Sequence, residues 1–193
     1  MEDKDFLVVG IGTSAGGLDA LRSFFSNIPA DSRSAYIVVM HLLRSYESRL
    51  DELLQKQASL PVKRVDEDMA IEPGIVYVMP ENVYMTIESD ILKPRLREKA
   101  INNKAVDIFF DSLAKEFKQR AIAIVLSGVG SDGLKGVEKI EEAGGCVFAQ
   151  DPDSTDFDGM PMSVIKFDKP KLIATPELLA KAVVDYEQAF RSV

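Results

Sequence analysis

Short apolar runs alternate with longer amphipathic stretches over most of this chain. The short runs carry no polar alternation, which is typical of strands that are covered on both faces. They lie at residues 6–11, 36–40, 121–126 and 146–149. The longer stretches place apolar residues three and four positions apart, which is the period of a helix. They predict helices over residues 18–25, 48–57, 105–117, 134–143 and about 176–190.

This alternation of strands and helices predicts an α/β fold with a doubly wound, mostly parallel sheet flanked by helices. Residues 62–96 depart from the pattern, because four short apolar runs follow one another with turn residues such as Pro73-Gly74 between them. We interpret this stretch as an antiparallel β-hairpin insert. The length of 193 residues suits one compact domain that spans residues 1–193.

The composition narrows the classes of function. A formal net charge of -8 argues against broad non-specific binding to nucleic acid or to anionic membranes. No signal peptide is recognisable, and no apolar stretch approaches the roughly 20 residues of a membrane-spanning helix. The single cysteine, Cys146, allows no internal disulfide. We therefore expect a cytoplasmic protein that neither binds nucleic acid nor inserts into a membrane.

The first predicted strand continues into a glycine-rich segment, Gly-Ile-Gly-Thr-Ser-Ala-Gly-Gly, at residues 10–17. A Gly-x-Ser-x-Gly sequence between a strand and a helix is the pattern of a nucleophile elbow, which would lift Ser14 above the sheet edge. The spacing of Gly10, Gly12 and Ala15 also fits a dinucleotide-binding turn, although the second strand lacks the acidic residue that would hold a ribose. A plain glycine-rich turn without chemistry is the third interpretation.

A base and a carboxylate that could serve Ser14 follow other predicted strands. The only histidine, His41, follows the strand at 36–40, and Asp132 lies in the glycine-rich loop 127–133. Parallel strands bring their carboxyl ends to one sheet edge, where the imidazole would take the serine proton and the carboxylate would orient the imidazole. The alternatives are a structural histidine, an Asp132 that caps the following helix, and a loop that binds phosphate.

The sequence gives no support for a metal or a cofactor, and we expect neither. Residues 151–159 are rich in carboxylates and loosely resemble a calcium loop, but Gly159 falls at the ninth position instead of the sixth. A glutamate is also missing at the twelfth position, which is Met162. One histidine and one cysteine argue against a zinc site, and Cys146 is interpreted as a packing residue of a core strand.

Taken together, the motifs resemble the catalytic domain of the chemotaxis protein-glutamate methylesterases (the CheB-type family). The resemblance extends over nearly the whole chain, and the order and spacing of its motifs are together highly specific. The motifs lie at residues 10–17, 37–41, 73–80, 126–133, 143–145, 149–152 and 158–161.

The resemblance implies a doubly wound parallel sheet with an antiparallel hairpin, and a Ser-His-Asp triad. The matching residues are Ser14 as nucleophile, His41 as general base and acid, and Asp132 as the orienting carboxylate. Our candidates for binding the oxyanion are the backbone N–H groups of Ala15 and Val129. The implied reaction is hydrolysis of γ-glutamyl methyl esters on the cytoplasmic helices of methylated chemoreceptors, with release of methanol. Many members also deamidate receptor glutamines.

Three residues depart from the pattern of the family. They are Met40, where glutamine is frequent, Val129, where methionine is frequent, and Met162, where arginine is frequent. These departures motivate an alternative, a catalytically weak regulatory or interaction module of the same fold that binds receptor or signalling partners. Typical members carry a receiver domain, and residues 41–48 also resemble members joined to a methyltransferase module. Either module is an expected partner within a longer chain.

Overall fold

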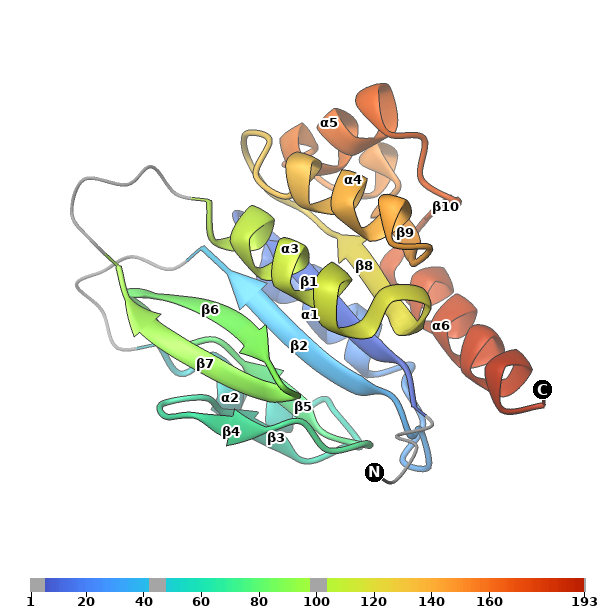
Figure 1. The fold of residues 1–193 in the computed structure, drawn as a ribbon. Helices are drawn as coiled ribbons and strands as arrows, with labels where there is room; N and C mark the ends of the chain where they lie inside the picture. The colour runs from blue at the N-terminus through green and yellow to red at the C-terminus, as the bar shows by residue number, and fades with distance from the viewer. Residues whose placement is uncertain (1–5, 42–47, 98–103, 193) are drawn as a thin grey trace.

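The computed structural model describes residues 6–41, 48–97 and 104–192, which form two sheets with helices packed on them (Figure 1). The larger sheet has seven strands in the order β10-β9-β8-β1-β2-β5-β3, and all its pairings are parallel. Its strands are β1 (Val8–Thr13), β2 (Ala35–Met40), β3 (Val62–Arg64), β5 (Val76–Val78), β8 (Ala121–Val125), β9 (Cys146–Gln150) and β10 (Leu172–Ala174). The smaller, antiparallel sheet comprises β4 (Met69–Ala70), β6 (Val83–Glu88) and β7 (Ile91–Leu96). The predicted α/β fold with a mostly parallel sheet is confirmed.

Helices cover both faces of the larger sheet, as a doubly wound fold requires. In Figure 1, helices α3 (Ala105–Phe117), α4 (Leu134–Glu142) and α5 (Gly159–Phe167) lie in front of the sheet. Helices α1 (Gly17–Phe25), α2 (Leu50–Gln55) and α6 (Pro176–Arg191) lie behind it. Two short 3-10 helices, η1 (Lys118–Arg120) and η2 (Pro152–Ser154), complete the elements. None of the helices within the described ranges is long and apolar enough to cross a lipid bilayer.

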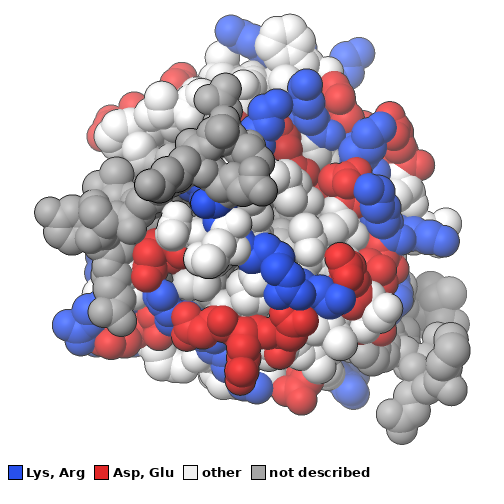
Figure 2. Space-filling view, turned by 60° about the vertical axis from the view of Figure 1, so that its left-hand side comes forward, with Lys and Arg blue, Asp and Glu red and all other residues white. Residues whose placement is uncertain are grey.

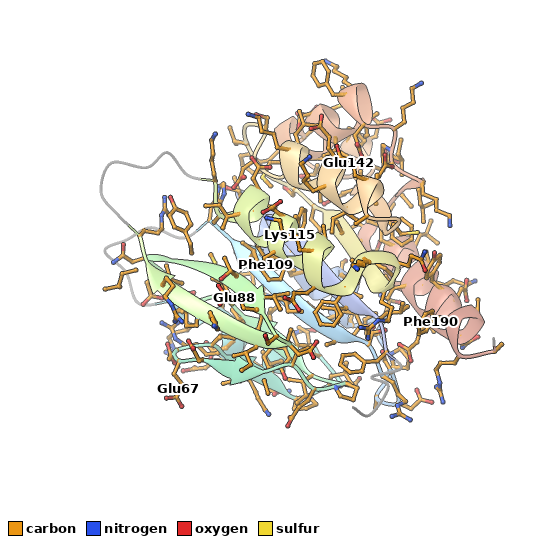
Figure 3. The ribbon with its side chains drawn as sticks, in the orientation of Figure 1. Glu67, Glu88, Phe109, Lys115, Glu142 and Phe190 are labelled. Atoms are coloured by element: carbon orange, nitrogen blue, oxygen red, sulfur yellow. The ribbon has the colours of Figure 1, made fainter. Side chains whose placement is uncertain are left out.

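The two faces of the sheet bury separate hydrophobic cores. Successive residues of a strand point to opposite faces, so Val8 packs with the α3 side and Val9 with the α1 side. Phe109, labelled in Figure 3, is fully buried between α3 and the sheet, whereas Lys115 projects from the outer side of the same helix. The apolar face of each helix therefore explains the period seen in the sequence.

The hairpin prediction for residues 62–96 is confirmed for β6 and β7 and is wrong for β3 and β5. These two strands belong to the larger sheet, where β5 pairs in parallel with β2 on one side and with β3 on the other. All three residues of β5 are buried. Strands of three residues carry little periodicity, and parallel pairing joins segments that are far apart in the chain. Local sequence therefore could not assign them to a sheet.

The order of the strands in the sheet reverses its direction of growth at β1. From β1 the chain continues to β2 on one side, and it returns to β8 on the other side. At such a switch point the connections after neighbouring strands leave in opposite directions and open a crevice outside the carboxyl ends, where ligands of doubly wound proteins bind. Ser14 follows β1, His41 follows β2, and the loop of residues 127–133 follows β8. The predicted site residues therefore share this sheet edge.

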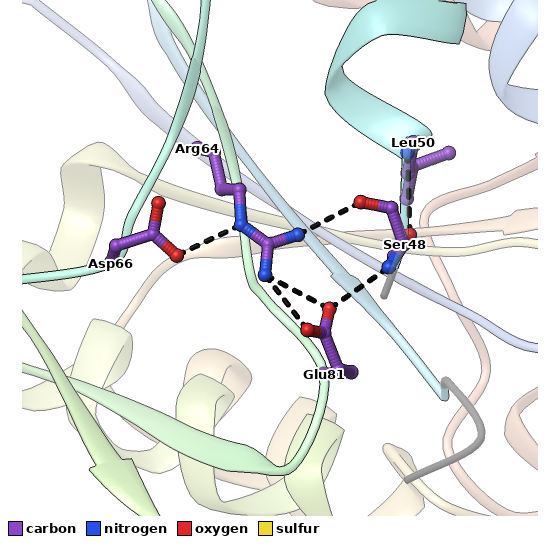
Figure 4. A network of polar contacts seen from close by, with 5 residues as sticks. All are labelled: Ser48, Leu50, Arg64, Asp66 and Glu81. Atoms are coloured by element: carbon purple, nitrogen blue, oxygen red, sulfur yellow. Dashed lines mark hydrogen bonds and ion pairs between the residues drawn. The ribbon is translucent and has the colours of Figure 1, made fainter. Parts of the chain in front are cut away.

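A half-buried arginine fixes the chain at Ser48, ahead of α2 (Figure 4). Arg64 donates two hydrogen bonds to the carboxylate of Glu81, at 3.0 and 2.9 Å, and one to Asp66 at 2.8 Å. It also donates to the carbonyl oxygen of Ser48 at 2.9 Å, and the Ser48 amide donates to Glu81 at 3.1 Å. The bidentate pair links β3 to the loop between β5 and β6, and the two Ser48 contacts link both to the chain ahead of α2. Residues 42–47, within the segment that resembles methyltransferase-linked members, lie outside the described residues.

The surface around the smaller sheet carries charges of both signs. Figure 2 shows Lys and Arg side chains interspersed with Asp and Glu on this side of the molecule. Several of them form exposed pairs, such as Arg95 with Asp68 at 2.6 Å and Lys93 with Glu88 at 2.5 Å. Exposed pairs of this kind contribute only about 0–1 kcal/mol each. We therefore attribute the stability of this region to the apolar core and not to its charges.

A buried carboxylate joins α6 to the chain before β2. Glu187 accepts hydrogen bonds from the hydroxyls of Ser32 and Ser34, both at 2.7 Å, and from the amides of Arg33 at 2.8 Å and Ser34 at 3.1 Å. Burial raises the pKa of Glu187, but these hydrogen bonds outweigh it and hold the pKa below the ordinary value of 4.5. The ionised carboxylate is therefore the form that stabilises the fold.

Glu187→Ala is expected to lower the free energy of unfolding by about 2–4 kcal/mol, because four donors, three of them buried, lose their acceptor. The folded-state pKa is depressed, so the stabilisation is present above pH 4.5 and is lost as the pH falls through the folded-state value. Urea unfolding at pH 7 and at pH 3.5 measures both effects. Asp185→Ala, at an exposed carboxylate on the same helix, is the control. Equal losses in the two variants at pH 7 would contradict the expectation.

Candidate active site

Ser14 lies at a sharp turn between β1 and α1. Its amide donates to the carbonyl oxygen of Ser127 at 2.9 Å, and its own carbonyl accepts the amide of Gly17 at 3.0 Å. Gly16 has a φ of 73° in the left-handed region, and a Cβ there would lie 2.5 Å from the Ser127 Oγ. Only glycine fits this position without displacement of its neighbours. The strand, turn and helix of a nucleophile elbow are thus all present.

Two further glycines of the segment, Gly10 and Gly12, serve helix packing. A Cβ on Gly12 would lie 2.4 Å from Val106 Cγ1, and one on Gly10 would lie 2.8 Å from Leu113 Cδ2. Both glycines therefore allow α3 to pack closely on β1. Their spacing is explained without a dinucleotide, and β2 ends at Met40 with no acidic residue next to it.

His41 lies beside Ser14 and is paired with Asp132. The His41 amide donates to the carbonyl oxygen of Thr13 at 3.2 Å, which continues the parallel register of β1 and β2 by one residue. His41 and Ser14 therefore occupy adjacent strand ends. The imidazole Nε2 lies 2.6 Å from Asp132 Oδ2, and the two side chains are only 13% and 6% exposed. This contact joins residues that are 91 positions apart.

Asp132 also caps a helix, although not the one that follows it. Its Oδ2 accepts the amide of Val106 at 3.0 Å, and its Oδ1 accepts the amide of Asp107 at 3.0 Å. These amides belong to the first turn of α3, whose positive dipole end favours a carboxylate. The alternative that Asp132 caps the following helix is wrong, because Gly133 is the N-cap of α4 and provides no side chain.

Sequence reasoning missed Ser127 as an organiser of the elbow. Its carbonyl oxygen accepts Thr13 Oγ1 at 2.7 Å as well as the Ser14 amide, and its Oγ donates to the carbonyl of Ala15 at 2.7 Å. Its amide donates to the side-chain oxygen of Gln150 at 2.8 Å. The buried Ser127 thus fixes the chain on both sides of Ser14. Its place at the start of a Ser-Gly-x-Gly loop was the available signal.

Two backbone N–H groups next to Ser14 remain available to a ligand. Among the hydrogen bonds of the described residues, none uses the amide of Ala15 or that of Val129. Gly128 lies against the nucleophile position, because a Cβ on it would be 3.0 Å from Ser14 Cβ. Its amide donates to the carbonyl of Phe157 at 2.8 Å, which fixes the loop. The Val129 side chain is 63% exposed and leaves the region open.

A hollow of about 410 Å³ opens beside His41. It is lined by His41, Lys104, Asp107, Val129, Gly130, Ser131, Asp132, Leu134 and Lys135. A second hollow of about 430 Å³ lies on the α1 side, and its lining includes Gly16 and Phe157. The elbow is therefore flanked by accessible space on both faces of the sheet edge, which suits a substrate segment longer than a single side chain.

The acidic loop after β9 has a local structural role. Asp151 Oδ1 accepts the amide of Asp153 at 3.1 Å and so caps η2. Among the described residues, no group of three His, Cys, Asp or Glu side chains is placed to hold a metal ion. Cys146 is buried in β9.

The doubly wound sheet and the convergence of Ser14, His41 and Asp132 at its switch point define a class, the doubly wound α/β proteins with a polar site at the carboxyl ends of their parallel strands. The chain order Ser, His, Asp differs from the Ser, Asp, His of the α/β-hydrolases. The family model for CheB methylesterase matches residues 9–183, and this chain belongs to that family.

Known relatives agree with this assignment. The protein-glutamate methylesterase/protein-glutamine glutaminase 2 of Pseudomonas fluorescens is 30% identical over 184 residues, which cover 94% of this chain and 49% of the relative. A Leptospira interrogans relative named for the same two activities is 26% identical over 95% of this chain and 96% of its own. The crystal structure of the Thermotoga maritima CheB methylesterase catalytic domain superposes with a TM-score of 0.85 at 27% identity, and covers 94% of this chain and 98% of that one. The chain thus spans about half the length of the Pseudomonas relative.

Proposed function

We propose that this chain hydrolyses γ-glutamyl methyl esters on the cytoplasmic helices of chemoreceptors, with release of methanol, and that it also deamidates receptor glutamines. The observation that carries the proposal is the buried contact of 2.6 Å between His41 and Asp132, beside Ser14 at the switch point of the sheet. Membership of the CheB methylesterase family and the names of the relatives support the substrate class.

In the first step, Ser14 Oγ attacks the carbonyl carbon of the ester while His41 takes the hydroxyl proton. The imidazole Nε2 faces Asp132, so Nδ1 is the ring nitrogen that would accept this proton. The oxyanion is bound by the amides of Ala15 and Val129. The loss of one such donor typically costs about 100- to 1000-fold in rate.

Collapse of the tetrahedral intermediate breaks the bond to the methoxy oxygen, and His41 returns the proton so that methanol leaves. The product is a glutamyl ester of Ser14. A water molecule, deprotonated by His41, then attacks this ester, and the second collapse releases the glutamate carboxylate and restores the Ser14 hydroxyl. With a glutamine substrate the same sequence releases ammonia. Asp132 stabilises the imidazolium that forms in each step.

The proposal extends to the setting of the enzyme. Residues 1–193 act as one catalytic unit in the cytoplasm, and in a longer chain a receiver domain or a methyltransferase module would govern access to the site. The greater length of the Pseudomonas relative supports such an arrangement. Conversion of a neutral ester to a carboxylate changes the charge on a receptor helix and would thereby bias signalling.

Methanol release from methylated cytoplasmic fragments of chemoreceptors tests the reaction, and ammonia release from glutamine-containing fragments tests deamidation. Labelling with a fluorophosphonate probe independently tests whether Ser14 is an activated nucleophile. Turnover together with labelling supports the proposal. Folded protein that binds the fragments but neither labels nor turns them over would favour the alternative, a regulatory module of the same fold.

A further inference from the structure

A second carboxylate, Asp107, lies in the first turn of α3 next to the Asp132 contact. Its Oδ1 accepts the amide of Gly133 and the amide of Gly136, both at 2.9 Å. These are the N-cap and a first-turn amide of α4, a helix whose own N-cap lacks a side chain. The sequence alone predicts no functional role for Asp107.

Asp107 and Asp132 therefore cap each other's helices. Asp132 accepts amides from the start of α3, and Asp107, on α3, accepts amides from the start of α4. The two helices approach closely at this point, because a Cβ on Gly136 would lie 2.6 Å from Phe110 Cβ. Loss of either carboxylate would leave helix amides without an acceptor in a tightly packed region.

We infer that Asp107 is a positioning residue for the proposed reaction, which holds the Asp132-Gly133 peptide against α3 so that the Asp132 carboxylate stays on His41. This inference rests on the proposed function of Ser14, His41 and Asp132. The Gly133 amide is part of the peptide bond that directly follows Asp132, so its hydrogen bond to Asp107 fixes the backbone next to the orienting carboxylate. A displacement of about 1 Å in such a constellation can cost roughly 100-fold in rate.

The charge of Asp107 also acts on the pair formed by His41 and Asp132. Burial raises the pKa of Asp107 above its ordinary 3.8, as does the negative charge of Asp132, while hydrogen bonds from the α4 amides oppose the rise. Besides Asp132, the titratable groups that line this hollow are Lys104 at the start of α3, Lys135 on α4 and His41, which follows β2. Ionised Asp107 thus adds a second negative charge on the side from which the imidazolium of His41 is stabilised.

Two substitutions separate the geometric role from the electrostatic one. Asp107→Ala removes the acceptor of both α4 amides and the negative charge, and we expect kcat for methanol release to fall about 10- to 100-fold with KM nearly unchanged. Asp107→Asn keeps an oxygen that accepts the α4 amides, so it should retain most of the wild-type kcat. Asp111→Asn is the matched control, because Asp111 lies one turn further on α3 and pairs at the surface with Lys115.

The chain has one histidine, so NMR titration of its imidazole C–H signals reports on His41 alone. Asp107 lines the same hollow as His41, so removal of its charge in Asp107→Asn should move this titration to lower pH by about half a pH unit. The acidic limb of the rate profile should move in the same direction. Asp111→Asn should titrate like the wild type.

The outcomes are distinguishable. A purely structural role would lower the melting temperature of the Asp107 variants but leave kcat per folded molecule and the His41 titration at wild-type values, and this result would overturn the inference. A wild type that neither turns over nor labels would instead refute the proposed function. The titration needs no turnover, so it still decides whether Asp107 acts on His41.

Discussion

Replacing Ser14 by alanine is expected to lower kcat for methanol release by about 10⁴- to 10⁶-fold, because loss of the nucleophile of a triad leaves only catalysis by binding and by the oxyanion donors. The Oγ is the only non-hydrogen atom removed, and the backbone of the elbow is fixed by hydrogen bonds that Ser14→Ala retains. The variant should therefore fold normally and still bind a methylated receptor fragment.

The measurement is single-turnover methanol release, followed together with circular dichroism and with fluorophosphonate labelling. Ser26→Ala is the control, because this exposed serine lies at the far end of α1 and its hydroxyl bonds only locally, to Ser23 and Asn27. Ser26→Ala should match the wild type in all three measurements. Retention of more than about a tenth of the wild-type rate by Ser14→Ala would exclude Ser14 as the nucleophile.

Asp132→Asn is expected to have the second-largest effect, a loss of about 10⁴-fold in kcat, as for an orienting carboxylate replaced by its amide in other triads. The asparagine would offer no negative charge to the imidazolium. It would also place an NH₂ group at one of the two oxygen positions, where Oδ2 now faces His41 and the Val106 amide and Oδ1 accepts the Asp107 amide. The imidazole would then lose the partner that selects its tautomer.

The same substitution should also cost about 1–2 kcal/mol of stability, since Asp132 caps α3 as well as orienting His41. Denaturation in urea separates this loss from the loss in rate, which is measured per folded molecule. Asp153→Asn, at an exposed carboxylate of η2, is the control for the charge change. A variant that is destabilised but turns over at the wild-type rate would limit Asp132 to the role of a helix cap.

The three departures from the family pattern do not remove any backbone group of the site. Val129 keeps its amide and presents an exposed side chain to the hollow beside His41. Met40 is half-buried at the end of β2, and Met162 is half-buried on α5. Their side chains therefore bear on the fit of a substrate more directly than on the triad. We therefore expect these three side chains to change KM among receptor fragments more than kcat.

The amino-acid sequence by itself determined the elements that bury a periodic apolar face. Helix α3 spans Ala105–Phe117, the range that its periodicity predicts, and the parallel strands β1, β2, β8 and β9 lie within one or two residues of their predicted runs. Helix α5 and strand β10 went unpredicted, because the former begins with Gly159 and has Pro161 in its first turn, and the latter has three residues. A period can be recognised only over several turns or several strand residues, so periodicity predicts only long, regular segments.

The sequence also placed Ser14 and His41 at the ends of strands, and the order of its motifs pointed to the family. The tertiary structure alone decided that β3 and β5 enter the parallel sheet, that Asp132 caps α3 instead of α4, and that Ser127 and Asp107 brace the site. Each of these depends on hydrogen bonds between residues far apart in the chain, 26 positions for Asp132 with Val106 and 112 for Ser127 with Ala15. No local pattern records such contacts, because the acceptor is chosen only when two elements pack against each other.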